Sequence, residues 1–155
     1  MEMTEIYEGI VQVLSGTVGS VCFAMLFNIR GLRLAVASLG GFISWSLYLV
    51  FNFLTESEVF SYFLVAALIT LYSEYMARVV KTPTTTFIMA SLVPLIPGAS
   101  LYYTMRYAFA GDFTDFGSKA VYTLELAAAL ALGVIIATGV AKAVFKRLGK
   151  RKAQQ

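Results

Sequence analysis

The residues best placed to do chemistry surround two prolines in the middle of a long uncharged run. Pro94 and Pro97 lie three positions apart, and Gly98 follows directly. Because proline has no amide hydrogen, the carbonyls four positions earlier, at Ala90 and Val93, lose their helical donors. An unpaired backbone polar group in hydrocarbon costs on the order of several kcal/mol. The sequence therefore predicts a broken helix whose free backbone groups face protein or water.

The residues after the break could bind an anion. Pro97 suits the first position of a new helix, and Gly98 lets a ligand or another backbone come close. The amides that follow would form a positive helix end in the middle of the run, and half-helix ends of this kind hold the substrate in many secondary transporters. Hydroxyl groups on both sides of the break could add hydrogen bonds. The candidate substrate-binding residues are Ala90, Ser91, Val93, Pro94, Pro97, Gly98, Ala99, Ser100 and Thr104.

A plain proline kink is the structural alternative for the same residues. Kinks of this kind are common in membrane helices, and neighbouring Ser or Thr side chains can satisfy the freed carbonyls. Thr84, Thr85 and Thr86 follow Pro83 and are expected to cap the start of the first half-helix. The spacing of the prolines alone does not choose between a kink and a substrate site.

Two ionisable residues fall within apolar runs. Glu74 precedes Arg78 by four residues, which predicts an ion pair on one helix face. Glu125 lies near the start of the last run, where it could extend towards the interface or take up and release a proton, as acids within the membrane do in pumps and transporters. Glu125 is therefore the candidate for proton coupling.

The residue types that are missing exclude most catalytic chemistry. The chain has no His and a single Cys, Cys22, so a His-centred catalytic site, a Cys/His zinc site and an internal disulfide are excluded. No phosphate-binding glycine loop occurs. We expect no enzymatic activity, no catalytic residues, no metal and no cofactor. Six of the twelve basic residues lie between Lys142 and Lys152, so the positive charge is concentrated in a C-terminal tail. The net charge of +3 therefore gives no reason to expect binding to nucleic acid.

The composition predicts an all-α, polytopic membrane protein. Of 155 residues, 59% are hydrophobic and 14% charged, and the mean hydropathy is +0.77, which excludes a water-soluble domain. A helix needs about 20 mostly apolar residues to cross the hydrocarbon of a bilayer. One transmembrane domain with five such spans is predicted, the fourth broken at Pro94-Pro97-Gly98. The spans cover about 9–29, 34–55, 59–77, 82–107 and 120–141, followed by a basic tail, 142–155.

The basic residues orient these spans in the membrane. Five spans put ten of the twelve Lys and Arg residues on one side, which should be the cytosol. We therefore expect the N-terminus outside and the C-terminus inside, in a cell inner (plasma) membrane. The ten residues are Arg30, Arg33, Arg78, Lys81, Lys142, Lys146, Arg147, Lys150, Arg151 and Lys152.

Two separated motifs carry a family resemblance. The stretch Pro94-Leu95-Ile96-Pro97-Gly98-Ala99-Ser100-Leu101-Tyr102 resembles the P-x-x-P-G-x-x-x-Y signature of the threonine/serine exporter family, in the form found in the C-terminal half of fused exporters. Phe23-Ala24-Met25-Leu26-Phe27-Asn28, then Arg33 and Gly40-Gly41, resembles the family's first cytosolic turn and second helix. The resemblance covers roughly 16–107.

The resemblance implies an exporter of small hydrophilic metabolites, either amino acids such as threonine and serine or small dicarboxylates such as succinate. It also implies a partner, a longer membrane subunit that matches the N-terminal half of the fused form. The expected function is a subunit of a secondary-active exporter that works by alternating access around the broken helix. The alternative is a non-transporting scaffold that stabilises the larger partner.

Small residues predict close helix contacts. Ser15 with Gly19 and Gly16 with Ser20 form two small-residue pairs in the first span. A further small-residue ridge runs along the last span, at Ala129, Gly133, Ala137 and Ala141. One ridge should pack within the subunit, and the other could meet a second chain, either the partner or another copy in a homo-oligomer.

Overall fold

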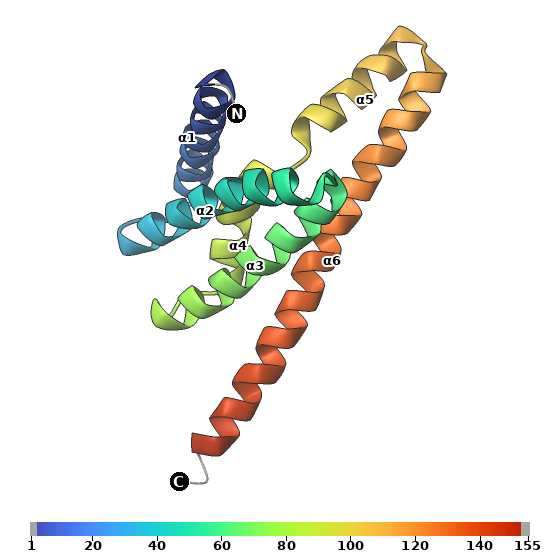
Figure 1. Ribbon diagram of the computed structural model, residues 1–155. Helices are drawn as coiled ribbons and strands as arrows, with labels where there is room; N and C mark the ends of the chain where they lie inside the picture. The colour runs from blue at the N-terminus through green and yellow to red at the C-terminus, as the bar shows by residue number, and fades with distance from the viewer. Residues whose placement is uncertain (1–2, 153–155) are drawn as a thin grey trace.

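A computed structural model describes residues 3–152 of the chain and the side chains of residues 7–146. Every regular element in that range is helical (Figure 1), which confirms the all-α prediction. The elements are α1 (Met3–Leu26), α2 (Leu32–Thr55), α3 (Glu58–Val79), α4 (Thr84–Leu92), the short 3-10 helix η1 (Val93–Leu95), α5 (Gly98–Ala110) and α6 (Phe113–Lys152).

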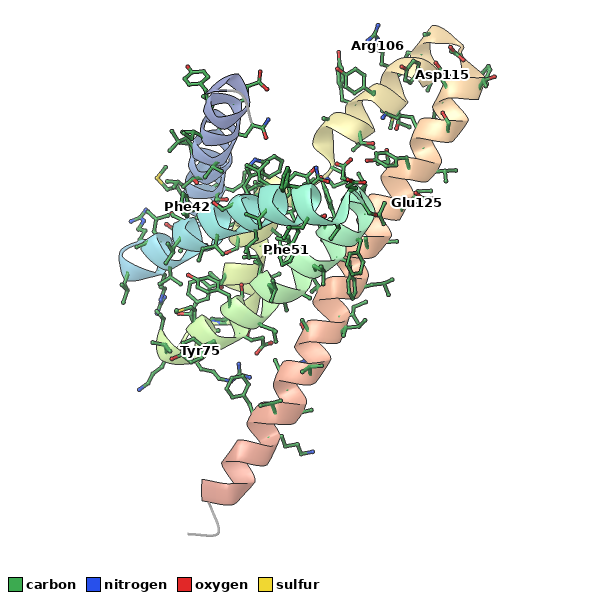
Figure 2. All side chains as sticks on the ribbon, viewed as in Figure 1. Phe42, Phe51, Tyr75, Arg106, Asp115 and Glu125 are labelled. Carbon is green, nitrogen blue, oxygen red and sulfur yellow. The ribbon has the colours of Figure 1, made fainter. Side chains whose placement is uncertain are left out.

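Four helices are long and apolar enough to cross a membrane: Tyr7–Leu26, Leu32–Thr55, Glu58–Val79 and Phe113–Lys146. A fifth is added if the bent pair Thr84–Leu95 and Gly98–Ala110 counts as one span. Large apolar side chains are exposed on all of these helices, and Figure 2 shows them projecting from α6 along much of its length. Lipid would cover such surfaces in a bilayer, so the architecture is that of a polytopic membrane protein.

The break falls where the prolines predicted it. Helix α4 ends at Leu92, Pro94 lies within η1, and Ile96 is extended, so α5 leaves at an angle of 58°. Two details differ from the prediction. Pro97 does not begin the new helix but precedes its first residue, Gly98. The carbonyl of Val93 is not left without a donor, because the amide of Ile96 donates to it over 3.2 Å.

Helix α6 is much longer than the predicted span 120–141. It begins at Phe113, directly after a left-handed turn at Gly111, and continues through the basic segment to Lys152. The prediction ended the element where charges begin, but Lys and Arg are good helix formers and do not stop a helix. Forty residues give α6 a length of about 60 Å. The side chains of 147–152 and residues 153–155 of the predicted tail lie outside the described residues.

Close contacts at glycines hold the helices together. A β-carbon at Gly40 would collide with the Ser91 side chain of α4, and one at Gly41 would collide with the Ser20 side chain of α1. Helix α2 is therefore pressed between α1 and α4 with no room for a methyl group on either side. The small-residue pair Gly16 and Ser20 packs inside the subunit, since Gly16 also lies against Pro94.

The small-residue ridge of α6 also packs within the chain. Ala129, Ala137 and Ala141 are buried, and Gly133 lies against the backbone of α3. Ser15 is exposed and Gly19 has open space beside it, so the pair Ser15 and Gly19 is the one left uncovered.

Gly133→Ala is expected to destabilise the folded chain by about 1–3 kcal/mol, because overpacking at a close helix contact forces the backbones apart. The added β-carbon would lie 2.6 Å from the Phe63 carbonyl oxygen of α3. Thermal unfolding of the purified chain in detergent measures the change. Gly139→Ala is the matched control, since Gly139 lies on the same helix with open space around it. Equal unfolding midpoints for the two variants would contradict the α3–α6 contact.

Candidate functional site

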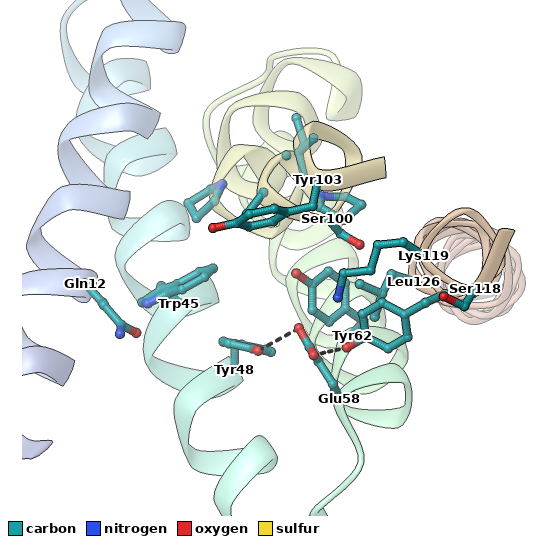
Figure 3. Close-up of a pocket in the computed structure, with 16 residues that line it drawn as sticks. Gln12, Trp45, Tyr48, Glu58, Tyr62, Ser100, Tyr103, Ser118, Lys119 and Leu126 are labelled. Carbon is teal, nitrogen blue, oxygen red and sulfur yellow. Dashed lines mark hydrogen bonds between the residues drawn. The ribbon is translucent and has the colours of Figure 1, made fainter. Parts of the chain in front are cut away.

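A cavity of about 660 Å³ lies beside the break, between residues of five helices and the short break segment (Figure 3). We call it the break cavity. Its volume is in the range of small-molecule sites in proteins. It is lined by Gln12 of α1, Trp45 and Tyr48 of α2, Glu58 and Tyr62 of α3, Pro94, Ile96 and Pro97 of the break, Gly98, Ala99, Ser100 and Tyr103 of α5, and Ser118, Lys119, Tyr122 and Leu126 of α6.

Glu58 holds the central position in this cavity. It is the first residue of α3, and two tyrosine hydroxyls donate to its carboxylate: Tyr48 of α2 to Oε1 over 3.1 Å and Tyr122 of α6 to Oε2 (Figure 3). Tyr62, one turn along α3, packs edge-to-face on Tyr48 with ring centroids 5.3 Å apart. The carboxylate is thus fixed where α2, α3 and α6 meet, and both of its oxygens are oriented by hydrogen bonds.

A cation faces the same space. Lys119 lies on α6 one turn before Tyr122, and its Nζ is 5.0 Å from the centroid of that ring. Figure 3 shows the ammonium directed towards the region of Glu58. Within the described part of the chain the one ion pair is Glu74 with Arg78, so Lys119 and Glu58 do not neutralise each other directly. The break cavity therefore presents a negative and a positive group to the same solute.

The start of α5 forms a third side of the cavity. Gly98, Ala99 and Ser100 line it, and a β-carbon at Gly98 would meet no atom within 4 Å. The Gly98 amide donates to the Ile96 carbonyl over 2.6 Å, so it is already occupied. The helix-start amides at Ala99 and Ser100 remain to favour an anion there.

Hydroxyl groups join the first turns of α5 to α6. Ser100 Oγ and Thr123 Oγ1 are 2.7 Å apart, and Thr104 Oγ1 lies 3.1 Å from the same Thr123 oxygen. Thr104 also donates to the Ser100 carbonyl over 2.9 Å. Ser100 lines the cavity, whereas Thr104 lies one turn farther from it and is buried. This network fixes the position of α5 relative to α6.

The structure separates the other predicted binding residues from the cavity. Ala90 is on the face of α4 that is buried in the core, and Ser91 is buried with its Oγ 3.4 Å from the Ala37 carbonyl of α2. Val93 faces a separate apolar groove that Phe23 and Val134 also line. Of the nine predicted residues, the break cavity brings together Pro94, Pro97, Gly98, Ala99 and Ser100.

The two acidic residues predicted within apolar runs, Glu74 and Glu125, both lie outside the break cavity. Glu74 and Arg78 form the predicted ion pair, with Arg78 Nη1 2.6 Å from Glu74 Oε2, and the guanidinium also lies over the Phe145 ring. Glu125 is exposed, lines a shallow groove with Phe60 of α3 and is not among the residues that line the break cavity; Figure 2 shows its place on α6.

The predicted threonine cap at the start of α4 is wrong. Pro83 occupies the capping position, and no side chain caps the helix there. The Thr82 hydroxyl turns back to the Val80 carbonyl. Proline fixes the chain direction at this helix start, so the threonines fall one to three positions too late to cap it.

The charged and tyrosine residues of the break cavity were not among the residues predicted from the sequence. Glu58 and Tyr62 lie four residues apart, and Lys119 and Tyr122 three apart, so each pair lies on one helix face. That spacing was a usable signal. It could not reveal that the two faces meet, because α3 and α6 are separated by the whole broken span.

A known protein family matches most of the chain. The family model described as "Threonine/Serine exporter, ThrE" matches residues 12–140. No curated protein and no solved structure matches the chain. The matched range contains every residue that lines the break cavity.

Proposed function

The chain belongs to the threonine/serine exporter family, and from that premise we propose that it is a subunit of a secondary-active exporter of small zwitterionic amino acids. Family membership favours a transporter over an enzyme. The observation that carries the proposal is the break cavity, in which a tyrosine-held Glu58 and Lys119 face one solute-sized space beside the start of α5.

The pair of charges selects the substrate class. An α-amino acid carries an ammonium, which Glu58 would bind, and a carboxylate, which Lys119 and the Ala99 and Ser100 amides would bind. A small dicarboxylate such as succinate would place a second negative charge near Glu58, and this repulsion is strong where water is scarce. The Ser100 hydroxyl adds a hydrogen-bonding group for the side chain of serine or threonine. We therefore favour amino acids over dicarboxylates.

The position of the break cavity fits the release side of an exporter. It lies between the N-terminal half of α1, the C-terminal half of α2 and the N-terminal parts of α3 and α6. With the N-terminus outside, as the basic residues predict, these parts lie in the outer half of the membrane. We propose that alternating access moves the substrate to this cavity before it leaves the cell.

We propose that the working exporter contains a second chain, the longer membrane subunit, in the plasma membrane. Helix α1 supports this, since it is splayed from α6 in Figure 1 and its Ser15 and Gly19 pair is uncovered. Uncovered small residues suit a close contact with a helix of another chain, either the longer subunit or a second copy.

A flux experiment tests the proposed function. Liposomes containing this chain, the longer subunit, or both are loaded with labelled threonine, serine or succinate, and efflux is measured. We expect saturable efflux of threonine and serine with both chains, and at least about tenfold slower efflux of succinate. Full efflux with the longer subunit alone would identify this chain as a scaffold. Faster succinate than threonine efflux would overturn the substrate assignment.

A further inference from the structure

A second cavity lies at the opposite end of α3 and α6 from the break cavity. Its volume is about 450 Å³, and we call it the Glu74 cavity. It is bounded by α3, the start of α4 and the C-terminal half of α6. Its polar lining consists of Glu74, Thr84, Thr85, Thr138 and Lys142, with apolar residues from α4 and α6 completing the wall.

The charges of this cavity come from the same two helices as those of the break cavity. Helix α3 supplies Glu58 to one cavity and Glu74 to the other, 16 residues or about 24 Å farther along. Helix α6 likewise supplies Lys119 and then Lys142. Each cavity therefore has one carboxylate from α3, one ammonium from α6 and hydroxyl groups nearby.

Glu74 is a buried acid at the wall of the cavity. Its side chain is 5% exposed, and Arg78 donates to Oε2, which leaves Oε1 without a partner among the described residues. Oε1 is not one of the fully buried oxygens that lack a partner, so it is open to a donor from the cavity. The ammonium group of an amino acid in the cavity would be such a donor.

Lys142 provides the complementary charge. It is exposed, it lies one turn after Thr138 on the same face of α6, and it forms no ion pair within the part of the chain that the structure describes. The first turn of α4 lies across the cavity from α6, where Thr84 and Thr85 line the wall. Lys142 and the Thr138 hydroxyl are placed to bind a substrate carboxylate.

An apolar layer separates the two cavities. Val65 and Ile69 of α3, Leu95 of the break and Leu126 of α6 belong to one buried cluster between them. Glu58 lies on one side of this cluster along α3 and Glu74 on the other. A solute can therefore occupy either end without an open path through the molecule, as alternating access requires.

We propose that the Glu74 cavity is the intake site, where the amino acid binds from the cytosolic face before it crosses to the break cavity. The proposal rests on the proposed function, because it assigns the first binding step of the same transport. The ligand class is a small zwitterionic amino acid, with its carboxylate at Lys142 and its ammonium at Glu74.

The test compares Lys142→Gln with Lys146→Gln in inside-out membrane vesicles that also contain the longer subunit. Both changes remove one positive charge from α6, but Lys146 is exposed one turn beyond the cavity. Uptake of labelled threonine is measured over a range of concentrations. We expect Lys142→Gln to raise the half-saturating concentration about tenfold and Lys146→Gln to leave it unchanged.

A second measurement separates this site from the break cavity. Trp45 is the chain's single tryptophan and lines the break cavity, so its fluorescence reports threonine binding there. Lys142→Gln should leave this titration unchanged. Thr138→Val removes the hydroxyl without changing the charge, and it should also raise the half-saturating concentration. This variant provides the test if Lys142→Gln does not accumulate in the membrane.

The outcomes are distinct. Equal half-saturating concentrations for the two lysine variants, with active wild-type vesicles, would overturn the intake site and leave the proposed function standing. A changed Trp45 titration in Lys142→Gln would also overturn it, because the lysine would then act through the break cavity. No uptake by wild-type vesicles would overturn the proposed function and the intake site together.

Discussion

Glu58→Gln is expected to lower the initial rate of threonine export by about 10- to 100-fold, the loss that accompanies removal of one charged hydrogen-bonding partner. The amide keeps the size of the side chain but removes the charge that would bind the substrate ammonium. It also replaces one acceptor oxygen with a donor, which faces a tyrosine hydroxyl, Tyr48 or Tyr122. Export from preloaded cells that express both subunits measures the rate.

The matched control for this prediction is Glu56→Gln. Glu56 lies two residues earlier, in the turn between α2 and α3, and does not line the break cavity. It should export at the wild-type rate. Threonine titration of Trp45 fluorescence separates binding from later steps, and Glu58→Gln should weaken it by a similar factor. If Glu58→Gln binds and exports threonine as the wild type does, the Glu58 carboxylate is not part of the substrate site.

Gly98→Leu is expected to abolish export while the protein still inserts and folds. A β-carbon at Gly98 meets no atom within 4 Å, and Gly98 lines the break cavity. The leucine side chain would therefore begin in open space and occupy part of the cavity where we propose that the substrate binds. Export assays and the amount of protein in the membrane are measured together. Gly98→Ala should keep part of the activity, because a methyl group fills little of the cavity.

Gly139→Leu is the control for the change in size. Gly139 is also a helical glycine with open space beside it, but it lies on α6 and does not line the break cavity. Its export rate should stay near that of the wild type. Normal export by Gly98→Leu would contradict the placement of the substrate beside the start of α5.

The break could be predicted from the sequence because its causes are local. A proline lacks its amide hydrogen wherever it occurs, so Pro94 and Pro97 end α4 and prevent a straight helix regardless of the neighbouring helices. The fate of each freed carbonyl was less predictable. The Val93 carbonyl accepts a hydrogen bond from the Ile96 amide, because the chain forms a 3-10 turn before it becomes extended.

The polar half of the candidate site could not be predicted in the same way. In the sequence, Glu58 is one acidic residue between two predicted spans. Its role depends on Tyr122, which is 64 residues away and joins it through the packing of α3 on α6. No local pattern specifies which helix faces meet, so the tyrosine-held carboxylate emerges only from the tertiary structure.

The adjacent glycines of α2 limit how this molecule can move. Ser20 fits against Gly41 from one side and Ser91 against Gly40 from the other, with no free volume at either point. Sliding or rotation at these two points would drive a serine into the α2 backbone, so α1, α2 and α4 should travel as a single rigid block during a transport cycle. Gly98, by contrast, has open space beside an added β-carbon, so we expect the alternating-access movement proposed above to turn at the start of α5.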